Sequence, residues 1–372
     1  MKVLLIFTYN TSLEDWENAG FIEREARYYK HFYDEHNVDF IFLTYGKEKD
    51  LTIAKNYFQN EVIPIFNNFK KSKYKTLNIL KSLIFPIYIN KLNLDFDIIK
   101  TNQLNGSWVA IILSLITKKP LIVRTGFDLF TFKTKESKNI LLTKFFYYLT
   151  KISLKFSSKY FSTSNTDIEN LVRLFPKYKQ KIVYMPNWVD DYPKNPNNLN
   201  KSRKIITVGR LEPQKNFEEM ISSLRNSNYK LDIVGSGSLE DKLKQLAKEQ
   251  NFEINFIGKI KYYELMNKLK NYLFFLSTSN YEGNPKAILE AMNSGCIVLA
   301  KSTPNIKEII EHDVNGLIYD NLDNLIKILN DTSSDKKKIK RISDEAYNSV
   351  QNNNKLSKLA ALEYQEFKKL FQ

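Results

Sequence analysis

The chain has 372 residues, of which 43% are hydrophobic and 26% are charged. This composition predicts a globular protein of two domains or one large one, and it excludes a disordered or collagen-like chain. The only cysteine, Cys296, cannot form an internal disulfide or a multi-cysteine metal site, which favours a cytosolic protein. No apolar run reaches the roughly 20 residues of a membrane-spanning helix, and residues 3–7 are too short a run for a signal peptide.

The net charge is +15 and is unevenly distributed along the chain. Residues 1–50 carry a net charge of −4, residues 51–200 carry +14 and residues 201–372 carry +5. A basic stretch of this size attracts anionic partners, such as nucleic acid, an acidic polymer or the anionic leaflet of a membrane. A lysine bias that serves solubility explains the same excess, so charge alone identifies no partner.

The first half of the chain alternates short β-branched runs with longer amphipathic segments, which predicts a β-α-β succession. The predicted strands are residues 3–7, 38–44, 98–101, 121–124, 160–163 and 182–184. The predicted helices lie near residues 20–35, 72–92, 106–117, 137–156 and 165–174.

A polar segment at residues 191–203, rich in Asn, Pro and Lys, is typical of a linker. Regular alternation follows it, with predicted strands at residues 204–208, 230–234, 254–257, 273–277 and 297–300. The predicted helices of this half are residues 216–226, 238–250, 262–270 and 285–294, and an amphipathic helix is expected within residues 352–372. Both halves are therefore expected to be doubly wound α/β domains, which bind ligands at the carboxyl ends of their strands.

The first candidate site follows the predicted strand at residues 204–208. Gly209 and Arg210 come directly after it, and Lys215 precedes a helix that Asn216 could cap. An Arg fork, a Lys point charge and the field of a helix N-terminus suit a diphosphate. Taken alone, the segment is better explained by a solvated basic turn. The glycines after strands in this half favour either a tight turn or a close approach to a ligand, without deciding between them.

The second candidate site lies around two carboxylates, Glu282 and Glu290, with seven residues between them. Glu282 falls in the loop after a strand, Pro285 suits the first turn of the next helix, and Glu290 lies within that helix. Because its neighbours on the helix are apolar, Glu290 requires donors such as ribose hydroxyls, or else a neighbouring lysine. The loop also offers backbone N–H groups at Gly283, Asn284 and Lys286.

Together these residues resemble glycosyltransferase family 4, a family of retaining enzymes with the GT-B fold. The matching motifs are Gly209-Arg210, Lys215, the E-x7-E spacing of Glu282 and Glu290, Ala291-Met292-x-x-Gly295, and Asn315-Gly316-Leu317-Ile318. Tyr184-Met185-Pro186-Asn187 is similar to the family's segment at the domain junction, although Trp188 stands in place of its glycine.

The resemblance implies two Rossmann-like domains facing a central cleft. The implied divisions are an acceptor-side domain at residues 1–190, a linker at 191–203, a nucleotide-sugar-binding domain at 204–350 and a helix at 351–372 that crosses back to the first domain. The implied activity is transfer of a hexose-type sugar, with retention, from a UDP- or GDP-sugar to a saccharide or lipid-linked acceptor in surface polysaccharide assembly.

The resemblance also implies residue roles. Arg210 and Lys215 would hold the donor diphosphate, Glu290 the ribose hydroxyls, and Glu282 would face the transferred sugar. The other residues assigned to the donor are Gly209, Gly235, Gly237, Lys259, Ile260, Gly283, Asn284, Pro285, Lys286 and Gly20. Because the two cations neutralise the leaving group, no metal or other cofactor is implied. Asp95-Phe96-Asp97 is expected to be a strand-entry turn instead of a metal motif.

The first half matches this family less closely. Gly20, expected to open the first helix, is similar to a glycine turn of the family, whereas the histidine common after its fourth strand is absent. Arg124, Thr125 and Asp128 are the alternatives for an acceptor-side role. Lysines alternate with aromatic residues between 133 and 159, which predicts that residues 70–160 bind an anionic membrane from the cytoplasmic side. The alternative places these aromatic residues in the core.

Two other functions fit parts of the pattern. A nucleotide-sugar 2-epimerase of the same fold would lack a reason for the paired carboxylates. A catalytically silent nucleotide- or lipid-binding partner would not need Arg210, Lys215, Glu282 and Glu290 together. A nucleic-acid-binding role lacks any recognition motif.

Overall fold

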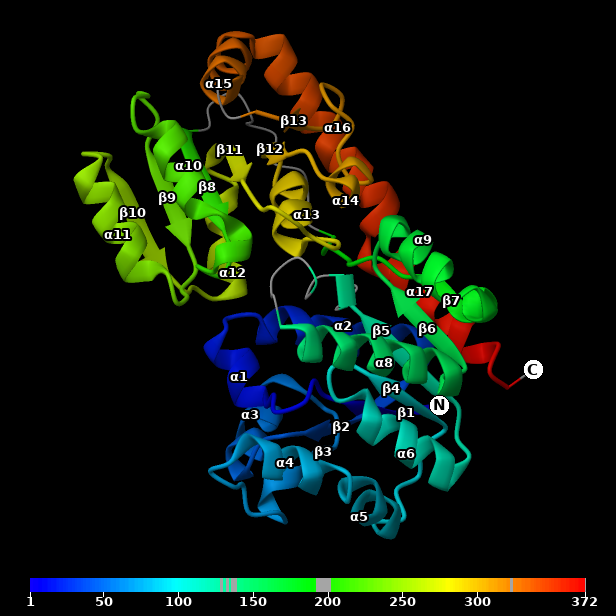
Figure 1. Ribbon diagram of the computed structural model, residues 1–372. Coiled ribbons are helices and arrows are strands. Elements are labelled where there is room, and N and C mark those ends of the chain that lie inside the picture. Colours follow the sequence, from blue (N-terminus) through cyan, green and yellow to red (C-terminus); the bar gives the residue numbers. More distant parts are fainter. Residues whose placement is uncertain (128–129, 132–133, 135–138, 192–201, 322–323, 372) are drawn as a thin grey trace. The chain divides into compact units, whose positions relative to one another are not determined.

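The computed structural model describes residues 1–127, 130–131, 134, 139–191, 202–321 and 324–371 (Figure 1). The chain forms two compact units, Met1–Met185 with Leu359–Gln372, and Pro186–Lys358. Each unit is built on a parallel β-sheet. None of the helices in the described residues combines the length and the apolar character needed to cross a membrane.

The described strands of the first unit form a parallel sheet in the order β3-β2-β1-β4-β5-β6-β7. They are β1 (Lys2–Ile6), β2 (Asp39–Thr44), β3 (Val62–Pro64), β4 (Ile98–Thr101), β5 (Leu121–Thr125), β6 (Lys159–Ser162) and β7 (Ile182–Tyr184). The central strands are buried on both faces, which explains their nearly continuous apolar sequences.

Helices cover both faces of this sheet. They are α1 (Leu13–Asn18), α2 (Ile22–His36), α3 (Glu48–Tyr57), α4 (Lys75–Ser82), α5 (Phe85–Lys91), α6 (Ser107–Thr117), α8 (Ile140–Phe156), α9 (Asn165–Leu174) and α17 (Leu356–Lys368), most of which belongs to this unit. Right-handed crossovers leave β1 and β4 in opposite directions, so α2 and α3 lie on one face and α6 and α8 on the other. Phe367 of α17 packs on Phe32 of α2.

The described strands of the second unit form a parallel sheet in the order β10-β9-β8-β11-β12-β13. They are β8 (Ser202–Val208), β9 (Leu231–Val234), β10 (Ile254–Gly258), β11 (Tyr272–Ser277), β12 (Ile297–Lys301) and β13 (Leu317–Tyr319). Its helices are α10 (Phe217–Leu224), α11 (Glu240–Glu249), α12 (Tyr262–Leu269), α13 (Lys286–Asn293), α14 (Pro304–Lys307), α15 (Leu325–Ser334) and α16 (Lys336–Asn354).

Successive side chains along the strands of this second sheet are buried in two separate hydrophobic cores, one on each face. Ile205 and Phe274 point into the core that α10, α11 and α15 cover. Their chain neighbours Ile206 and Phe275 point into the core that α12, α13 and α16 cover. The period of two along each strand therefore accounts for burial on both faces of the sheet.

Most predicted elements are found within one or two residues of their expected bounds. The helix expected at 20–35 is α2, and a separate short helix, α1, precedes it. Gly20 takes a left-handed φ of +79° just after α1 and ends that helix. The helix expected at 72–92 is two helices, since Pro86 in the first turn of α5 has no N–H with which to continue α4. The elements α1, α3, β3, α14, β13, α15 and α16 were not predicted. Residues 192–201 of the expected linker lie outside the described residues.

Candidate functional site

The strand order of the second unit brings two loops to the same point. β8 and β11 are neighbours, and the crossovers that follow them run in opposite directions. The loops that leave them, residues 209–216 and 278–285, therefore start side by side at the carboxyl edge of the sheet. This is the position where doubly wound sheets bind ligands. Both candidate segments of the sequence are located there.

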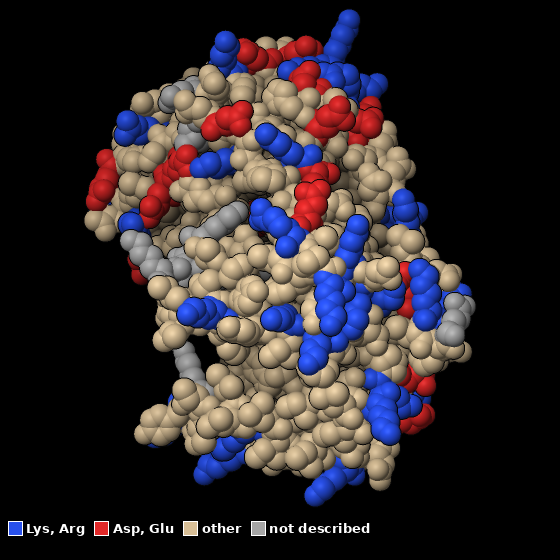
Figure 2. Space-filling model, turned by 45° about the vertical axis from the view of Figure 1, so that its right-hand side comes forward, with Lys and Arg blue, Asp and Glu red and all other residues tan. Residues whose placement is uncertain are grey.

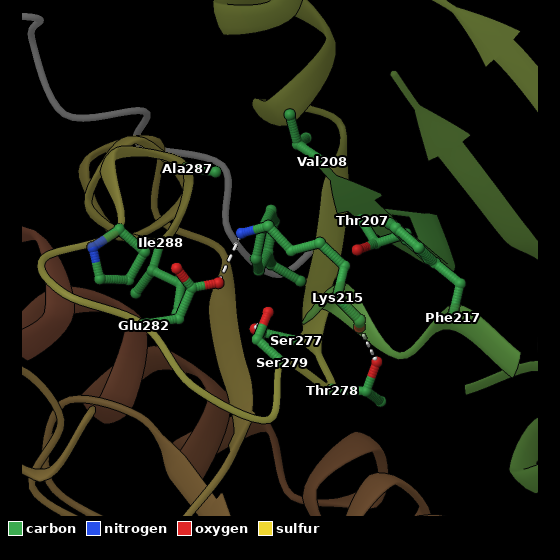
Figure 3. Close-up of a pocket in the computed structure, with 12 residues that line it drawn as sticks. Thr207, Val208, Lys215, Phe217, Ser277, Thr278, Ser279, Glu282, Ala287 and Ile288 are labelled. Carbon is green, nitrogen blue, oxygen red and sulfur yellow. Dashed lines mark hydrogen bonds and ion pairs between the residues drawn. The ribbon is translucent and has the colours of Figure 1, made fainter. Parts of the chain in front are cut away.

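An ion pair joins these two loops. Lys215 Nζ lies 2.5 Å from Glu282 Oε1, and the two side chains are 19% and 8% exposed. Figure 3 shows the two side chains pointing toward one another beside a small pocket. The pocket is also lined by Pro285 and by the hydroxyl-bearing residues Thr207, Ser277, Thr278 and Ser279. A cation, a carboxylate and several hydroxyl groups thus lie together at the edge of the sheet.

Hydrogen bonds fix the backbone around this ion pair. The Thr278 hydroxyl donates to the carbonyl oxygens of Lys215 at 2.9 Å and Asn216 at 3.0 Å. The buried Gln214 side chain donates to the Tyr281 carbonyl at 2.9 Å. Asn216 is the N-cap residue of α10, as expected, but it lies in the left-handed region and its side chain makes no capping hydrogen bond. The cationic loop is therefore held mainly by the loop after β11.

The glycines at this edge are required by close packing of protein against protein. A Cβ on Gly209 would lie 3.3 Å from Cε of Lys215, so the glycine leaves space for that side chain to cross. A Cβ on Gly235, at a φ of +137°, would lie 1.9 Å from the Gly209 carbonyl oxygen. A Cβ on Gly237 would lie 2.5 Å from the Leu211 carbonyl oxygen. These contacts explain both Gly235 and Gly237 without a ligand.

A carboxylate next to Arg210 has a structural role. Glu212 accepts hydrogen bonds from the backbone N–H of Ser238 at 3.0 Å and from its hydroxyl at 2.8 Å. These bonds, with a smaller contribution from the Arg210 charge, hold the pKa of Glu212 below its usual value. Arg210 itself is exposed. Its guanidinium is therefore open to solvent at the same edge of the sheet as Lys215.

Helix α13 starts at the pocket and carries the second carboxylate. Pro285 is its N-cap and lines the pocket, while Glu290 lies in the middle of the helix and is only 3% exposed. Within the described part of the chain, the backbone N–H groups of Gly283 and Asn284 have no protein acceptor. The start of α13 thus leaves two donors at the end of the loop that carries Glu282.

Asn284 and the first residue of α13, Lys286, contact the segment that enters the unit. The Asn284 side-chain oxygen accepts a hydrogen bond from the backbone N–H of Asn187 at 2.9 Å, and its carbonyl accepts one from the Asn187 amide at 2.5 Å. The Lys286 ammonium lies 5.8 Å from the centre of the buried Trp188 ring. The Asn284 side chain is therefore occupied by protein, whereas the donor that the sequence offered to a ligand at this residue is its backbone N–H.

Comparison with known proteins gives these loops a context. Residues 189–349 match the profile of the family described as "Glycosyl transferases group 1". The capsular polysaccharide biosynthesis glycosyltransferase CapH of Staphylococcus aureus is 32% identical over 165 residues, which are 41% of this chain and 44% of CapH. The chain spans only 31–44% of the length of the first three curated relatives that it matches.

A longer match is with an Escherichia coli UDP-Gal:alpha-D-GlcNAc-diphosphoundecaprenol alpha-1,3-galactosyltransferase. It is 25% identical over 263 residues, which are 65% of this chain and 67% of that enzyme. Among solved structures, Anabaena Alr3699/HepE in complex with UDP and glucose superposes with a TM-score of 0.77 at 16% identity, covering 99% of this chain and 100% of that one. The chain has the GT-B fold.

Within this GT-B fold, the loop after β10 adjoins the glycines described above. The Gly235 N–H donates to the Gly258 carbonyl at 2.8 Å. Lys259 is exposed, and Ile260 is half-buried against the core under α12 and α13. Lys259 and Ile260 therefore follow directly after Gly258, whose carbonyl is hydrogen-bonded to Gly235, the residue that packs against Gly209.

The first unit uses three of its expected site residues for its own structure. Gly20 follows α1 instead of opening the first helix, and its N–H is bound to the Glu17 carbonyl at 2.9 Å. Arg124 lies close enough to the buried Lys100 and Glu363 to lower the pKa of both. The Thr125 hydroxyl donates to the carbonyl of Phe127. Asp128 lies outside the described residues.

The aspartates at residues 95 and 97 bind the start of the sheet. Asp97 accepts a hydrogen bond from the Lys2 backbone N–H at 2.8 Å, and Asp95 pairs with the Lys2 ammonium at 3.1 Å. This is the strand-entry turn that the sequence predicted. Among the described residues no group of three or more His, Cys, Asp and Glu side chains is arranged to hold a metal ion.

Sequence reasoning missed the hydroxyl-bearing residues of the pocket. Ser277, Thr278 and Ser279 follow one another at the end of β11, and Thr207 lies near the end of the neighbouring strand β8. A run of Ser and Thr at the end of a buried strand was the available signal. Because such residues are common in turns, only the pairing of β8 with β11 shows that they line one pocket.

Proposed function

We propose that the protein is a glycosyltransferase that moves a sugar from a nucleotide-sugar donor to a saccharide or lipid-linked acceptor in the assembly of a surface polysaccharide. The observation that carries the proposal is the Lys215–Glu282 pair at the switch point of the second sheet. It is supported by the family match over residues 189–349 and by relatives named for capsule and lipid-linked saccharide synthesis.

The donor is a nucleoside diphosphate sugar, and UDP is the favoured carrier. A relative named for UDP-Gal and a structural neighbour bound to UDP support uridine over guanosine. The diphosphate carries two negative charges or more, so its site requires cations and N–H donors. Lys215, the exposed Arg210 and the open N–H groups of Gly283 and Asn284 supply both.

In this proposal the donor diphosphate replaces Glu282 as the counter-ion of Lys215. In the present structure the carboxylate neutralises the ammonium, which keeps two nearly buried charges paired. When the diphosphate binds Lys215, Glu282 is released toward the sugar. Lys215 and Arg210 then stabilise the charge that develops on the leaving diphosphate, without a metal ion. Glu290 binds the ribose.

We further propose that the transferred unit is a hexose-type sugar and that its anomeric configuration is retained. This finer assignment rests on the resemblance of the E-x7-E spacing to glycosyltransferase family 4. A nucleotide-sugar 2-epimerase and a silent binding partner are not favoured. The epimerase would give a product without any acceptor, and a silent partner would bind nucleotide without turnover.

The test is the thermal stability of the wild type and of Glu290→Ala in the presence of UDP, GDP, ADP, dTDP and their sugar conjugates. A ligand that binds the folded state raises the melting temperature by mass action. We expect UDP and one UDP-sugar to stabilise the wild type, and the substitution to remove this response. No response to any nucleotide would contradict the proposal. Transfer to a lipid-linked acceptor, measured with and without EDTA, then tests turnover and the absence of a metal.

A further inference from the structure

Exposed large apolar side chains are concentrated in one part of the first unit. Of the 21 exposed large hydrophobic residues in the described chain, 16 lie between Tyr74 and Phe156. Scattered exposed leucines are normal on a protein surface, whereas a contiguous group marks an interaction site. The distribution therefore requires an explanation that is local to this segment.

These residues belong to one continuous layer of helices. α4 packs against α5, α5 against α6, and α6 against α8. Figure 1 shows these four helices on the first unit, in light blue to green. The exposed residues of the layer outside α8 are Tyr74, Leu77, Ile79, Leu80, Leu83, Ile84, Ile87, Leu92, Leu115 and Ile116. The apolar surface is thus shared by neighbouring elements.

Helix α8 carries the clearest part of this surface. Its residues Leu141, Phe145, Tyr148 and Ile152 recur at helical spacing and are 80%, 45%, 56% and 44% exposed. The opposite side of the same helix is buried through Phe146, Leu149 and Leu154. Packing against the sheet accounts for the buried side only. The outer stripe has no role in the core of the unit.

Every charged residue within α4, α5, α6 and α8 is a lysine. Residues 62–94 and 139–166 contain no Asp or Glu. Lys144, Lys151 and Lys155 are exposed and lie along one edge of the α8 stripe. Figure 2 shows blue side chains among tan ones in the lower half of the view, with red confined to its edges. The layer is therefore apolar and cationic together.

We propose that the outer face of α4, α5, α6 and α8 binds the surface of an anionic lipid bilayer. The boundary between headgroups and acyl chains accepts apolar side chains, while lysines reach outward to anionic headgroups. The absence of acidic residues from 62–94 and 139–166 favours a uniformly anionic partner over a protein surface of mixed charge. Membrane binding does not depend on the proposed function, although it would bring the transferase to a lipid-linked acceptor.

The test is co-sedimentation of the full chain with vesicles. We expect binding to vesicles of phosphatidylcholine mixed with phosphatidylglycerol at low salt, and much weaker binding to pure phosphatidylcholine or at high salt. The triple variant Lys144→Gln/Lys151→Gln/Lys155→Gln should lower the partition coefficient on the order of 100-fold, since each lysine near the surface contributes about five-fold. Leu141→Gln/Phe145→Gln/Ile152→Gln should lower it even on strongly anionic vesicles.

Matched controls come from the second unit. Lys336→Gln/Lys337→Gln/Lys340→Gln on α16 removes three exposed lysines with the same change in net charge, and Tyr263→Gln removes an exposed aromatic ring. Neither should alter binding. The melting temperature and the response to UDP, measured on each variant, separate loss of membrane binding from unfolding and from failure of the proposed donor site.

Three outcomes would overturn the proposal. The first is no sedimentation with anionic vesicles at low salt. The second is equal loss of binding in the α8 and α16 lysine variants, which would show that net charge alone matters. The third is a dimer that the apolar α8 variant converts to a monomer, with no effect on vesicle binding, which would make the face an interface between two copies.

Discussion

At the scale of single residues, the site is built by side chains that compensate one another. Lys215 would be costly at 19% exposure without a partner, and Glu282 at 8% exposure provides it. The path of the Lys215 side chain depends on the missing Cβ of Gly209. The position of the Lys215 charge therefore depends on a residue that carries no charge and no side chain.

Lys215→Met should weaken UDP binding by about 10- to 100-fold, because one or two charge-assisted hydrogen bonds to the diphosphate are lost. The measurement is calorimetric titration with UDP. The control is Lys242→Met, which removes an exposed lysine paired with Glu218 in the same unit. Equal affinities of the wild type and Lys215→Met would show that the diphosphate does not bind there.

Gly235→Ala and Gly258→Ala form an informative pair. The added methyl group at position 235 would overlap the Gly209 carbonyl oxygen, whereas at position 258 nothing lies within 4 Å and only the left-handed φ of +76° is strained. We expect Gly258→Ala to lower the free energy of unfolding by about 1–2 kcal/mol, and Gly235→Ala by more than that. Urea unfolding measures both. Equal losses would mean that the close approach of these loops is not important.

At the scale of elements, a buried ionic cluster anchors α17 to the first unit. Glu363 of α17 contacts Lys100 of β4 and accepts a hydrogen bond from Tyr28 of α2. Burial lowers the pKa of Lys100, with Arg124 adding to the effect. Burial opposes ionisation of Glu363, but Lys100 and Arg124 outweigh it and lower its pKa. The helix at the end of the chain is thus held by charges from β4 and β5.

Lys100→Met should destabilise the first unit by about 3–5 kcal/mol, since it leaves the Glu363 carboxylate buried beside one cation fewer. Lys100→Met combined with Glu363→Met should recover most of this loss, because the buried carboxylate and the buried ammonium are removed together. The free energies of unfolding in urea decide between them. A single variant as stable as the wild type would indicate that water or Arg124 compensates fully.

His36, the last residue of α2, predicts a dependence on pH. Its ring stacks on Tyr364 of α17 at 4.6 Å, and burial together with the nearby His31 lowers its pKa from the usual 6.5. Below pH 6.5 the unfolded chain therefore binds the proton more readily than the folded one, so stability should fall as the pH decreases from 7.5 to 5.5. His36→Phe should reduce this slope. An unchanged slope in urea midpoints would assign it to other groups.

The sequence predicted secondary structure well wherever the packing of an element shows in the pattern of its own residues. Buried parallel strands gave unbroken apolar runs, so the strands from β8 to β12 were placed within two residues. The strand β13 is three residues long, and its pairing with β12 is non-local. Likewise, Glu282 and Lys215 were singled out separately, whereas their contact was not foreseen because 67 residues separate them.

At the scale of the whole molecule, the two units differ in the distribution of their charged residues. The second unit mixes both signs and carries the donor site that we propose, and the helical layer of the first unit presents lysines and apolar side chains. Two ligands of different chemistry should therefore act on different units.

Hydrogen–deuterium exchange should reveal these two footprints. UDP should slow exchange in peptides covering residues 208–216 and 277–290, and anionic vesicles should slow it in peptides covering 75–92 and 140–156. Each ligand should leave the other set of peptides unchanged. Protection of residues 140–156 by UDP, or of 208–216 by vesicles, would contradict this division.

The sequence by itself determined the two doubly wound halves and the chemistry of the residues after β8 and β11. The reason is that the apolar runs of buried strands and the residue types of loops are visible in short stretches of sequence. It could not decide whether the glycines serve a ligand or the protein, or which side of α8 faces the core. Both questions depend on what lies across space. Only the tertiary structure shows that Gly235 packs against Gly209, that Phe146 is buried and that Phe145, its neighbour in the chain, is exposed.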